Sequence, residues 1–194
     1  MKISENWRHL CIDMQRIFAE ETPWQVPWMG RVLPQVIEVA RHHSERTVFT
    51  RFIPPRSAQT AVGAWSDYYR KWWMMTGEHL PPEMLELVPE LQSFAPPARI
   101  IDKMVYSPWL EGLLAQELAR DQVRTLVVSG GETDVCVLST ILGAIDLGFR
   151  IVVLSDAVCS GTDETHDAAI DLLAKRFSVQ LDLVETEAFL SAQG

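Results

Sequence analysis

Short apolar segments alternate along the chain with longer segments in which apolar residues recur every three or four positions. The short segments carry continuous runs of Val, Ile and Leu, which are typical of strands that are buried on both faces of a sheet. Repeated alternation of this kind predicts an α/β fold of three layers, a mostly parallel six-stranded sheet with helices on both faces. The predicted strands lie at residues 9–13, 46–52, 98–103, 123–131, 149–157 and 178–185.

The longer segments carry the apolar spacing of helices. In residues 31–45, for example, Val32, Val36 and Val39 fall on one helical face. Residues 57–95 are less regular and contain several prolines, so we predict a long excursion with one helix inside it. The remaining predicted helices lie at residues 109–120, 134–148 and 163–177.

Composition and charge narrow the class of protein. The 194 residues are 47% hydrophobic and 22% charged, and no linker or repeat divides residues 1–194, so we expect one globular domain. The net charge of −9 disfavours binding to nucleic acid or to an anionic membrane, which leaves a small molecule as the expected partner. No apolar run approaches the roughly 20 residues of a membrane helix, and none near the N-terminus resembles a signal peptide. These features favour a cytoplasmic location.

The three cysteines are Cys11, Cys136 and Cys159. An odd number without a CxxC pair fits neither a disulfide framework nor a thiolate zinc site. Cys11 and Cys159 lie in or beside apolar strands, so we interpret them as small buried hydrophobic residues.

Polar residues follow several of the predicted strands. Asp13 ends the first strand, Arg51 lies near the end of the second, and Lys103 ends the third. Cys136 follows the fourth strand and a glycine pair. Because ligands of open parallel sheets bind beyond the carboxyl ends of the strands, we expect these side chains to gather at one edge.

Cys136 occupies the first turn of a predicted helix. The N-terminus of a helix and a neighbouring Lys103 ammonium would both lower the thiol pKa from roughly 8.5, which predicts a thiolate nucleophile at neutral pH. Asp13 could carry a proton between the thiol and a leaving amine. Each residue alone is more often a cap or a solvated charge, so position by itself predicts an enzyme without stating its chemistry.

Three segments together carry a family resemblance: LCIDMQRIF at 10–18, DKMVYSPW at 102–109 and VSGGETDVCVLSTILGAIDLGFRIVVLSDAV at 128–158. They resemble the isochorismatase-like cysteine hydrolase superfamily, which includes nicotinamidases, N-carbamoylsarcosine amidase, and ureidoacrylate and biuret amidohydrolases. The resemblance spans nearly the whole chain, and the fold that it implies is Rossmann-like.

The resemblance implies a catalytic triad of Asp13, Lys103 and Cys136. It also implies a cis peptide bond between Gly131 and Glu132, with an oxyanion hole formed by the backbone N–H groups of Glu132 and Cys136. The implied reaction is attack of the thiolate on a carbonyl carbon, loss of ammonia or an amine, and hydrolysis of the resulting thioester by water.

Two departures from the family pattern narrow the expected reaction. Nicotinamidases hold a metal with an Asp-x-His motif and a further His after the second strand, whereas residues 50–57 read TRFIPPRS. We therefore expect neither a metal nor a cofactor, and nicotinamide is a weaker substrate candidate. Isochorismatases that cleave a vinyl ether lack the cysteine, so Cys136 favours cleavage of a C–N bond in a small linear amide, carbamoyl or ureido compound. A nicotinamidase-like amidase, a non-enzymatic binding module and a thiol redox sensor are the alternatives.

Arg51, Trp65 and Tyr106 are the candidates for contact with the substrate. Arg51 could bind a substrate carboxylate or pair with a structural acid, and both roles stay open. Glu132 stands where relatives usually carry a small residue, which would shrink the pocket mouth or give it a charge.

An aromatic stripe occupies the excursion and shares one helical face. Such stripes more often form core or a subunit interface than the wall of a substrate pocket. Because members of the family commonly form oligomers, we expect a dimer or a tetramer. The stripe consists of Trp65, Tyr68, Tyr69 and Trp72.

Overall fold

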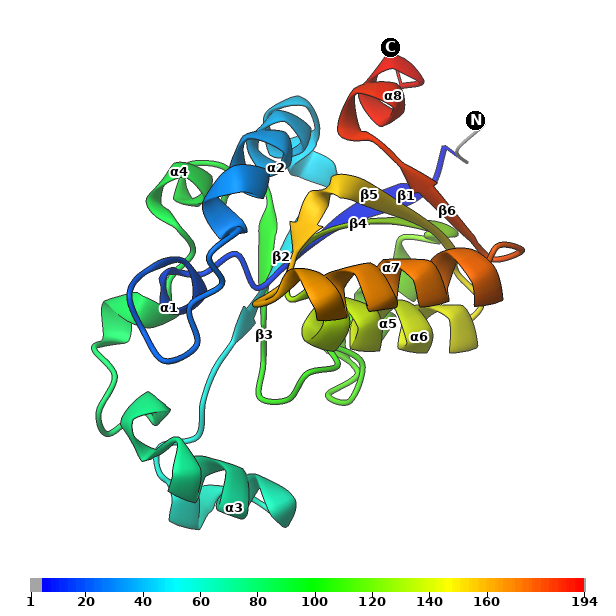
Figure 1. Cartoon of the computed structure of the whole chain (residues 1–194). Coiled ribbons are helices and arrows are strands. Elements are labelled where there is room, and N and C mark those ends of the chain that lie inside the picture. The colour runs from blue at the N-terminus through cyan, green and yellow to red at the C-terminus, as the bar shows by residue number, and fades with distance from the viewer. Residues whose placement is uncertain (1–4, 194) are drawn as a thin grey trace.

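The computed structural model describes residues 5–193, and six of its strands form one sheet (Figure 1). Every neighbouring pair of strands is parallel, in the order β3-β2-β1-β4-β5-β6. The α/β prediction is confirmed, and the sheet is wholly rather than mostly parallel. The strands are β1 (Trp7–Ile12), β2 (Thr47–Phe52), β3 (Arg99–Lys103), β4 (Thr125–Gly131), β5 (Arg150–Cys159) and β6 (Leu181–Val184).

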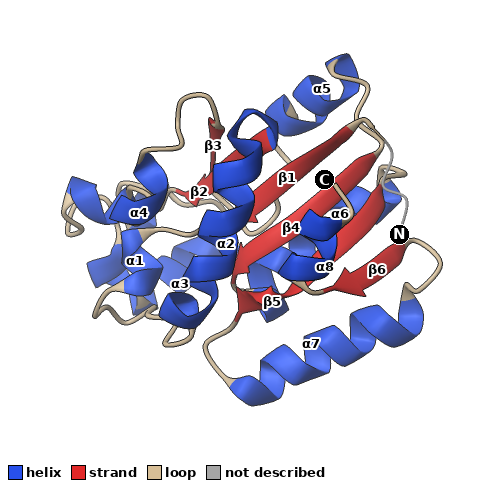
Figure 2. Ribbon diagram, turned by 90° about the horizontal axis from the view of Figure 1, so that it is seen from above, coloured by secondary structure: helices blue, strands red, loops and turns tan. Residues whose placement is uncertain are grey.

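Helices cover both faces of the sheet, as predicted. Buried residues of α2 and α8 pack into the core on one face, and those of α5, α6 and α7 pack into the core on the other. Figure 2 shows α2 and α8 lying across the first of these faces. The helices are α1 (Arg16–Ala19), α2 (Met29–His43), α3 (Ala64–Lys71), α4 (Pro89–Gln92), α5 (Leu113–Arg120), α6 (Leu138–Asp146), α7 (Asp163–Arg176) and α8 (Thr186–Ser191). Across residues 5–193, none of them has the length and apolarity needed to cross a membrane.

Two predicted helices begin later in the structure than the sequence indicated. The helix expected at 109–120 starts at Leu113, because Gly112 adopts a positive φ of 75° and Trp109 instead packs against α6. The helix expected at 134–148 is divided into a π-helical turn, η5 (Thr133–Val137), and α6. This division places Cys136 in the irregular turn rather than in a regular α-helix.

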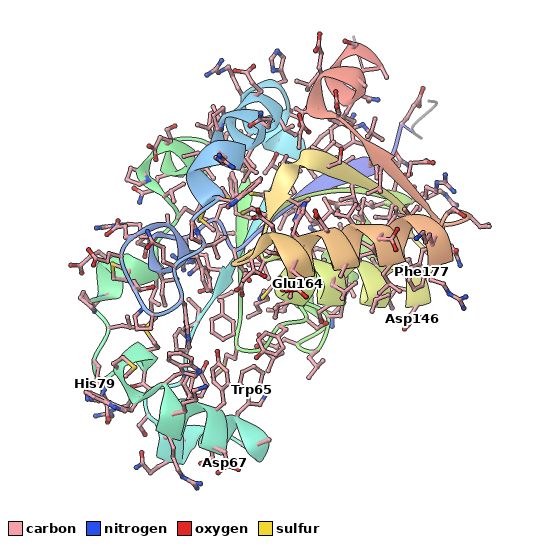
Figure 3. The ribbon with its side chains drawn as sticks, in the orientation of Figure 1. Trp65, Asp67, His79, Asp146, Glu164 and Phe177 are labelled. Atoms are coloured by element: carbon pink, nitrogen blue, oxygen red, sulfur yellow. The ribbon has the colours of Figure 1, made fainter. Side chains whose placement is uncertain are left out.

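The excursion between β2 and β3 lies at the end of the sheet toward which β2 points (Figure 1). Figure 3 shows Trp65 on the side of α3 that faces the sheet and Asp67 on the opposite side. The segment contains more helical turns than the one helix predicted, because its short turns have no long apolar period to detect. They are η2 (Ala58–Thr60), α3, η3 (Trp73–Met75), η4 (Pro82–Leu85) and α4; one further turn, η1 (Ser44–Arg46), precedes β2.

The winding of the chain reverses between β1 and β4. The chain passes outward from β1 to β2 and β3, then returns to β4 beside β1 and continues to β5 and β6. At this point Gly130 has a φ of 111°, and a Cβ there would overlap the backbone of Ile12. Only glycine allows this approach, which brings the ends of β1 and β4 together where ligands of such sheets bind.

Candidate active site

Asp13, Lys103 and Cys136 meet at the carboxyl ends of three strands. Asp13 follows β1, Lys103 is the last residue of β3, and Cys136 lies in η5 after β4. The Lys103 Nζ atom lies 2.7 Å from Asp13 Oδ2 and 3.6 Å from Cys136 Sγ. The exposed fractions of the three residues are 1%, 1% and 3%, so the cluster is shielded from bulk water.

Each oxygen atom of the Asp13 carboxylate contacts a different polar side chain. Asp13 has a φ of 49°, a conformation that Asp tolerates better than most residues. Its Oδ1 accepts a hydrogen bond of 2.6 Å from the Thr50 hydroxyl, and its backbone N–H donates to the same Thr50 oxygen. Thr50 therefore orients the carboxylate while Oδ2 faces Lys103.

Burial opposes the charge on Lys103, but the Asp13 carboxylate and the Cys136 sulfur more than offset it, so the pKa of Lys103 is raised. Burial and the charge of Asp13 raise the pKa of the Cys136 thiol well above its ordinary range, and Lys103 offsets only part of that rise. The prediction of a resting thiolate at neutral pH is therefore wrong. Desolvation outweighs the single ammonium and the helix end, so the thiol keeps its proton until a base accepts it.

The turn that carries Cys136 begins with a cis peptide bond and is held by backbone hydrogen bonds. The Gly131–Glu132 peptide bond is cis, at the position that the resemblance implies. The Glu132 carbonyl oxygen accepts hydrogen bonds from the N–H groups of Val135 and Val137 at 3.1 and 2.9 Å. The assignment of an oxyanion hole to this turn stays a prediction.

A cavity of about 60 Å³ reaches Cys136. Five aromatic side chains line it, together with one carboxyl group and the thiol. These residues are Phe18, Trp24, Phe52, Tyr68, Tyr106, Glu132 and Cys136. A larger cavity of about 630 Å³ lies between α2 and α8, but no triad residue lines it. The smaller cavity is therefore the candidate site.

Glu132 is the charged member of this lining. Burial and the nearby charges of Asp134 and Asp13 raise its pKa to about 7, and Lys103 acts in the opposite direction. Glu132 therefore changes its charge near neutral pH.

Residues 9–185 match the family model of the isochorismatase domain. The chain belongs to the isochorismatase family. It is 26% identical over 174 residues to Nicotinamidase 3 of Arabidopsis thaliana, an alignment that covers 89% of this chain and 83% of that protein. It is 27% identical over 178 residues to a "Probable inactive nicotinamidase" of the same plant, covering 87% of this chain and 89% of that protein.

A solved structure of a cysteine hydrolase from Pseudomonas syringae pv. phaseolicola 1448A superposes with a TM-score of 0.82. The superposition covers 96% of this chain and 92% of the other, at 20% sequence identity, so this likeness shows the fold. The chain is thus a member of a hydrolase family that includes nicotinamidases.

Arg51, one of the expected substrate contacts, lies outside the lining of the cavity that reaches Cys136. Its guanidinium bonds to both oxygens of Asp102, at 2.7 and 3.0 Å, and to Glu86 at 2.7 Å. Because side chains alternate along β2, Arg51 points away from the cavity while its neighbour Phe52 lines it. Of the two roles left open, pairing with structural acids is the one observed.

Trp65 and Tyr106 have different places. Tyr106 lines the cavity, whereas Trp65 packs behind it with ring centroids 4.8 Å apart. Trp65 is therefore a support for the cavity wall and not part of the wall, which corrects its assignment as a substrate contact.

Sequence reasoning missed four aromatic residues of the cavity. Tyr68 belongs to the predicted aromatic stripe, whose member Tyr69 is buried as core while Tyr68 itself faces Cys136's cavity. The alternation in β2 was a usable signal for Phe52. Phe18 and Trp24 follow β1 without a periodic signal, so only the fold could place them at the site.

Cys11 and Cys159 are buried, as predicted. Both pack in the core on the α2 face, whereas Cys136 packs in the core on the opposite face. Neither thiol thus shares the core of Cys136.

Within residues 5–193, no group of three or more His, Cys, Asp or Glu side chains is arranged to hold a metal ion. The expected independence of metals stays a prediction for experiment.

Proposed function

We propose that this protein is a metal-independent cysteine hydrolase that cleaves the C–N bond of a small amide, carbamoyl or ureido compound through a thioester. The observation that carries the proposal is the buried contact of Lys103 with both Asp13 and Cys136 beside a small cavity. An acid, an ammonium and a thiol in one dry site are the groups that acyl transfer from nitrogen requires.

In the proposed acylation, Cys136 Sγ attacks the carbonyl carbon while its proton passes to the Asp13 carboxylate. The raised thiol pKa makes this base necessary, because little thiolate exists before substrate binds. The oxyanion would receive hydrogen bonds from the N–H groups of Glu132 and Cys136. Breakage of the C–N bond follows as Asp13 returns its proton to the leaving nitrogen, and a thioester remains on Cys136.

In the proposed deacylation, water attacks the thioester carbon. Asp13 accepts a proton from the water, the C–S bond breaks, and the proton returns to Cys136 Sγ as the acid product leaves. The Lys103 ammonium lies 2.7 Å from the Asp13 carboxylate and balances its charge in the buried site.

The test is ammonia release from a panel of small amides, carbamoyl amino acids, ureido acids and nicotinamide, with a chelator present. We expect release by the wild type and no release by Cys136→Ala or Asp13→Asn. Cys159→Ala is the matched control, because it removes a buried thiol outside the cavity and should keep activity. Turnover by Cys136→Ala would overturn the covalent mechanism, and loss of activity with chelator would overturn metal independence.

Nicotinamide is the second candidate substrate, because Nicotinamidase 3 aligns with most of the chain. Release of ammonia from nicotinamide alone within the panel would establish the nicotinamidase-like alternative.

A non-enzymatic binding module is the third candidate, since one relative carries the name of an inactive nicotinamidase. Amide binding that is equal in the wild type and Cys136→Ala, without turnover by either, would favour the binding module. The cytoplasmic location and the dimer or tetramer stay predictions of the sequence.

A further inference from the structure

We propose that Glu132 selects substrates whose acyl portion carries an ammonium group, so that the enzyme acts on amino amides and excludes amides that carry a carboxylate. This inference rests on the proposed function and narrows its substrate class. It comes from the joint chemistry of the cavity lining, which combines five aromatic side chains with one carboxyl group.

The aromatic residues form a continuous wall. The ring of Trp24 lies 6.0 Å from Phe52, 5.9 Å from Tyr68 and 6.3 Å from Phe18, measured between centroids. Aromatic faces carry negative electrostatic potential and attract ammonium groups, most strongly where water is excluded. A wall of this kind thus favours a cation or a neutral group over an anion.

The cationic side chains near the cavity are already paired with other groups of the protein. Lys103 Nζ contacts Asp13 Oδ2 at 2.7 Å, the Val105 carbonyl oxygen at 3.2 Å and Cys136 Sγ at 3.6 Å. Arg51 is paired outside the cavity with Asp102 and Glu86. No Lys, Arg or His is among the residues that line the cavity. A substrate carboxylate would thus lie beside Glu132 without a counter-ion, which is costly in a partly buried site.

Several ionisable groups surround Glu132. Asp13 and Asp134 favour its neutral form, Lys103 favours its charged form, and Tyr68 and Tyr106 lie close enough to respond to its charge. An ammonium group in the cavity would act as Lys103 does and favour the carboxylate. Binding of an amino amide should therefore be accompanied by loss of a proton from Glu132 below about pH 7, whereas a neutral amide should bind without this change.

The first experiment measures the charge selectivity of the cavity without requiring turnover. Cys136 is modified with two thiol reagents of equal linker length, the cationic 2-aminoethyl and the anionic 2-sulfonatoethyl methanethiosulfonate. Modification is followed by mass spectrometry, with Cys136→Ala as the blank for Cys11 and Cys159. We expect Glu132→Gln to lower the ratio of cationic to anionic rates about tenfold or more, because one charge-assisted contact is lost and one repulsion removed.

Glu164→Gln is the matched control for net charge. Glu164 is exposed at the start of α7 (Figure 3). It does not line the cavity, so its replacement should leave the rate ratio at the wild-type value. A ratio that Glu132→Gln leaves unchanged, or that Glu164→Gln lowers equally, would overturn the selectivity. Circular dichroism of each variant confirms that the comparison is made on folded protein.

The second experiment measures kcat/KM for three amides of similar size: β-alaninamide, butyramide and succinamate, which are cationic, neutral and anionic. We expect the wild type to prefer β-alaninamide over butyramide, and Glu132→Gln to lower the ratio of the two kcat/KM values about tenfold, whatever its absolute rate. Turnover with no change in preference would overturn the selectivity and leave the hydrolase standing. No turnover of these amides or of the wider panel, with the expected change in reagent ratio, would overturn the hydrolase and leave the selectivity standing.

Discussion

Lys103 keeps its charge although almost no water reaches it, because Asp13 and Cys136 lie within contact distance. Removing one partner of a buried ion pair leaves an uncompensated charge and costs about 3–5 kcal/mol. We therefore expect Asp13→Asn and Lys103→Met each to lower the free energy of unfolding by that order. The double variant should cost less than the sum of the two, as measured by urea unfolding.

Asp102→Asn is the control for the Asp13 and Lys103 variants. Asp102 also pairs with a cation, Arg51, but its side chain is 48% exposed. Loss of an exposed pair costs about 0–1 kcal/mol, so a larger effect at Asp102 than at Asp13 would contradict the role of burial.

Glu132 is expected to destabilise the fold at neutral pH. Its pKa is about 7 in the fold and lower in the unfolded chain, near the ordinary value of about 4.3. Between these values the unfolded state loses its proton first, so stability falls as pH rises. Glu132→Gln should therefore match the wild type near pH 4 and exceed it above pH 7, by about 1.4 kcal/mol for each unit of pKa difference. Urea unfolding at pH 4.5, 6 and 8 measures this, and a constant difference across the range would refute it.

At the scale of single elements, the junction of β4 with η5 depends on Gly130. A Cβ there would meet the Ile12 backbone, and φ lies in the region that favours glycine. Gly148 also has a positive φ, but a Cβ at that position would meet only open space. We expect Gly148→Ala to cost about 1 kcal/mol of backbone strain. Gly130→Ala should cost several times more, because the clash forces β4 away from β1. Equal losses of thermal stability in the two variants would contradict the close approach.

Elements with a strong period could be predicted from the sequence, and those without one could not. Short apolar runs located all six strands, and helical spacing located α2 and α7. The turns of the excursion and the six-residue α8 are held by tertiary packing, so no local pattern marks them. The π-helical turn at Cys136 was likewise missed, since its residues suit a helix equally well.

At the scale of the whole molecule, the topology explains why the triad was predictable while the cavity was not. Asp13, Lys103 and Cys136 each stand at a strand end, and a parallel sheet brings such ends to one edge whatever the loops do. The cavity wall instead depends on how the excursion folds back, which sequence periodicity does not encode. The protonation of Cys136 also required the fold, because burial outweighed the neighbouring ammonium.

A buried histidine in the central strand β1 hydrogen-bonds to both neighbouring strands. The His9 ring lies in β1, with Nδ1 at 3.1 Å from the Thr47 hydroxyl of β2 and Nε2 at 2.8 Å from the Ser129 hydroxyl of β4. Thr47 donates its hydroxyl hydrogen to the His43 carbonyl oxygen, so Nδ1 must donate to Thr47 and Nε2 must accept from Ser129. Both ring nitrogens of the neutral imidazole thus have a hydrogen-bond partner. Protonation of Nε2 would remove the acceptor of the Ser129 hydroxyl, so that hydrogen bond would be lost.

The whole fold should therefore lose stability in acid through His9. Burial, aided by the charge of His43, lowers the pKa of His9 to about 3, against about 6.5 in the unfolded chain. Below pH 6.5 the unfolded state binds a proton that His9 in the folded state does not bind. The free energy of unfolding therefore falls by about 1.4 kcal/mol for each unit by which the pH is lowered. Above pH 6.5 this loss is absent.

Glu132 contributes with the opposite sign in part of the same range, so the measurement compares each variant with the wild type. We expect His9→Gln to reduce the pH dependence of urea unfolding between pH 7 and pH 5, even though the variant is less stable at pH 7. His42→Gln, at an exposed histidine of α2, is the control and should retain the wild-type dependence. A pH dependence that is unchanged in His9→Gln would show that the proton is taken up elsewhere. The bridge from β2 through His9 to β4 would then not be the acid-sensitive point of the sheet.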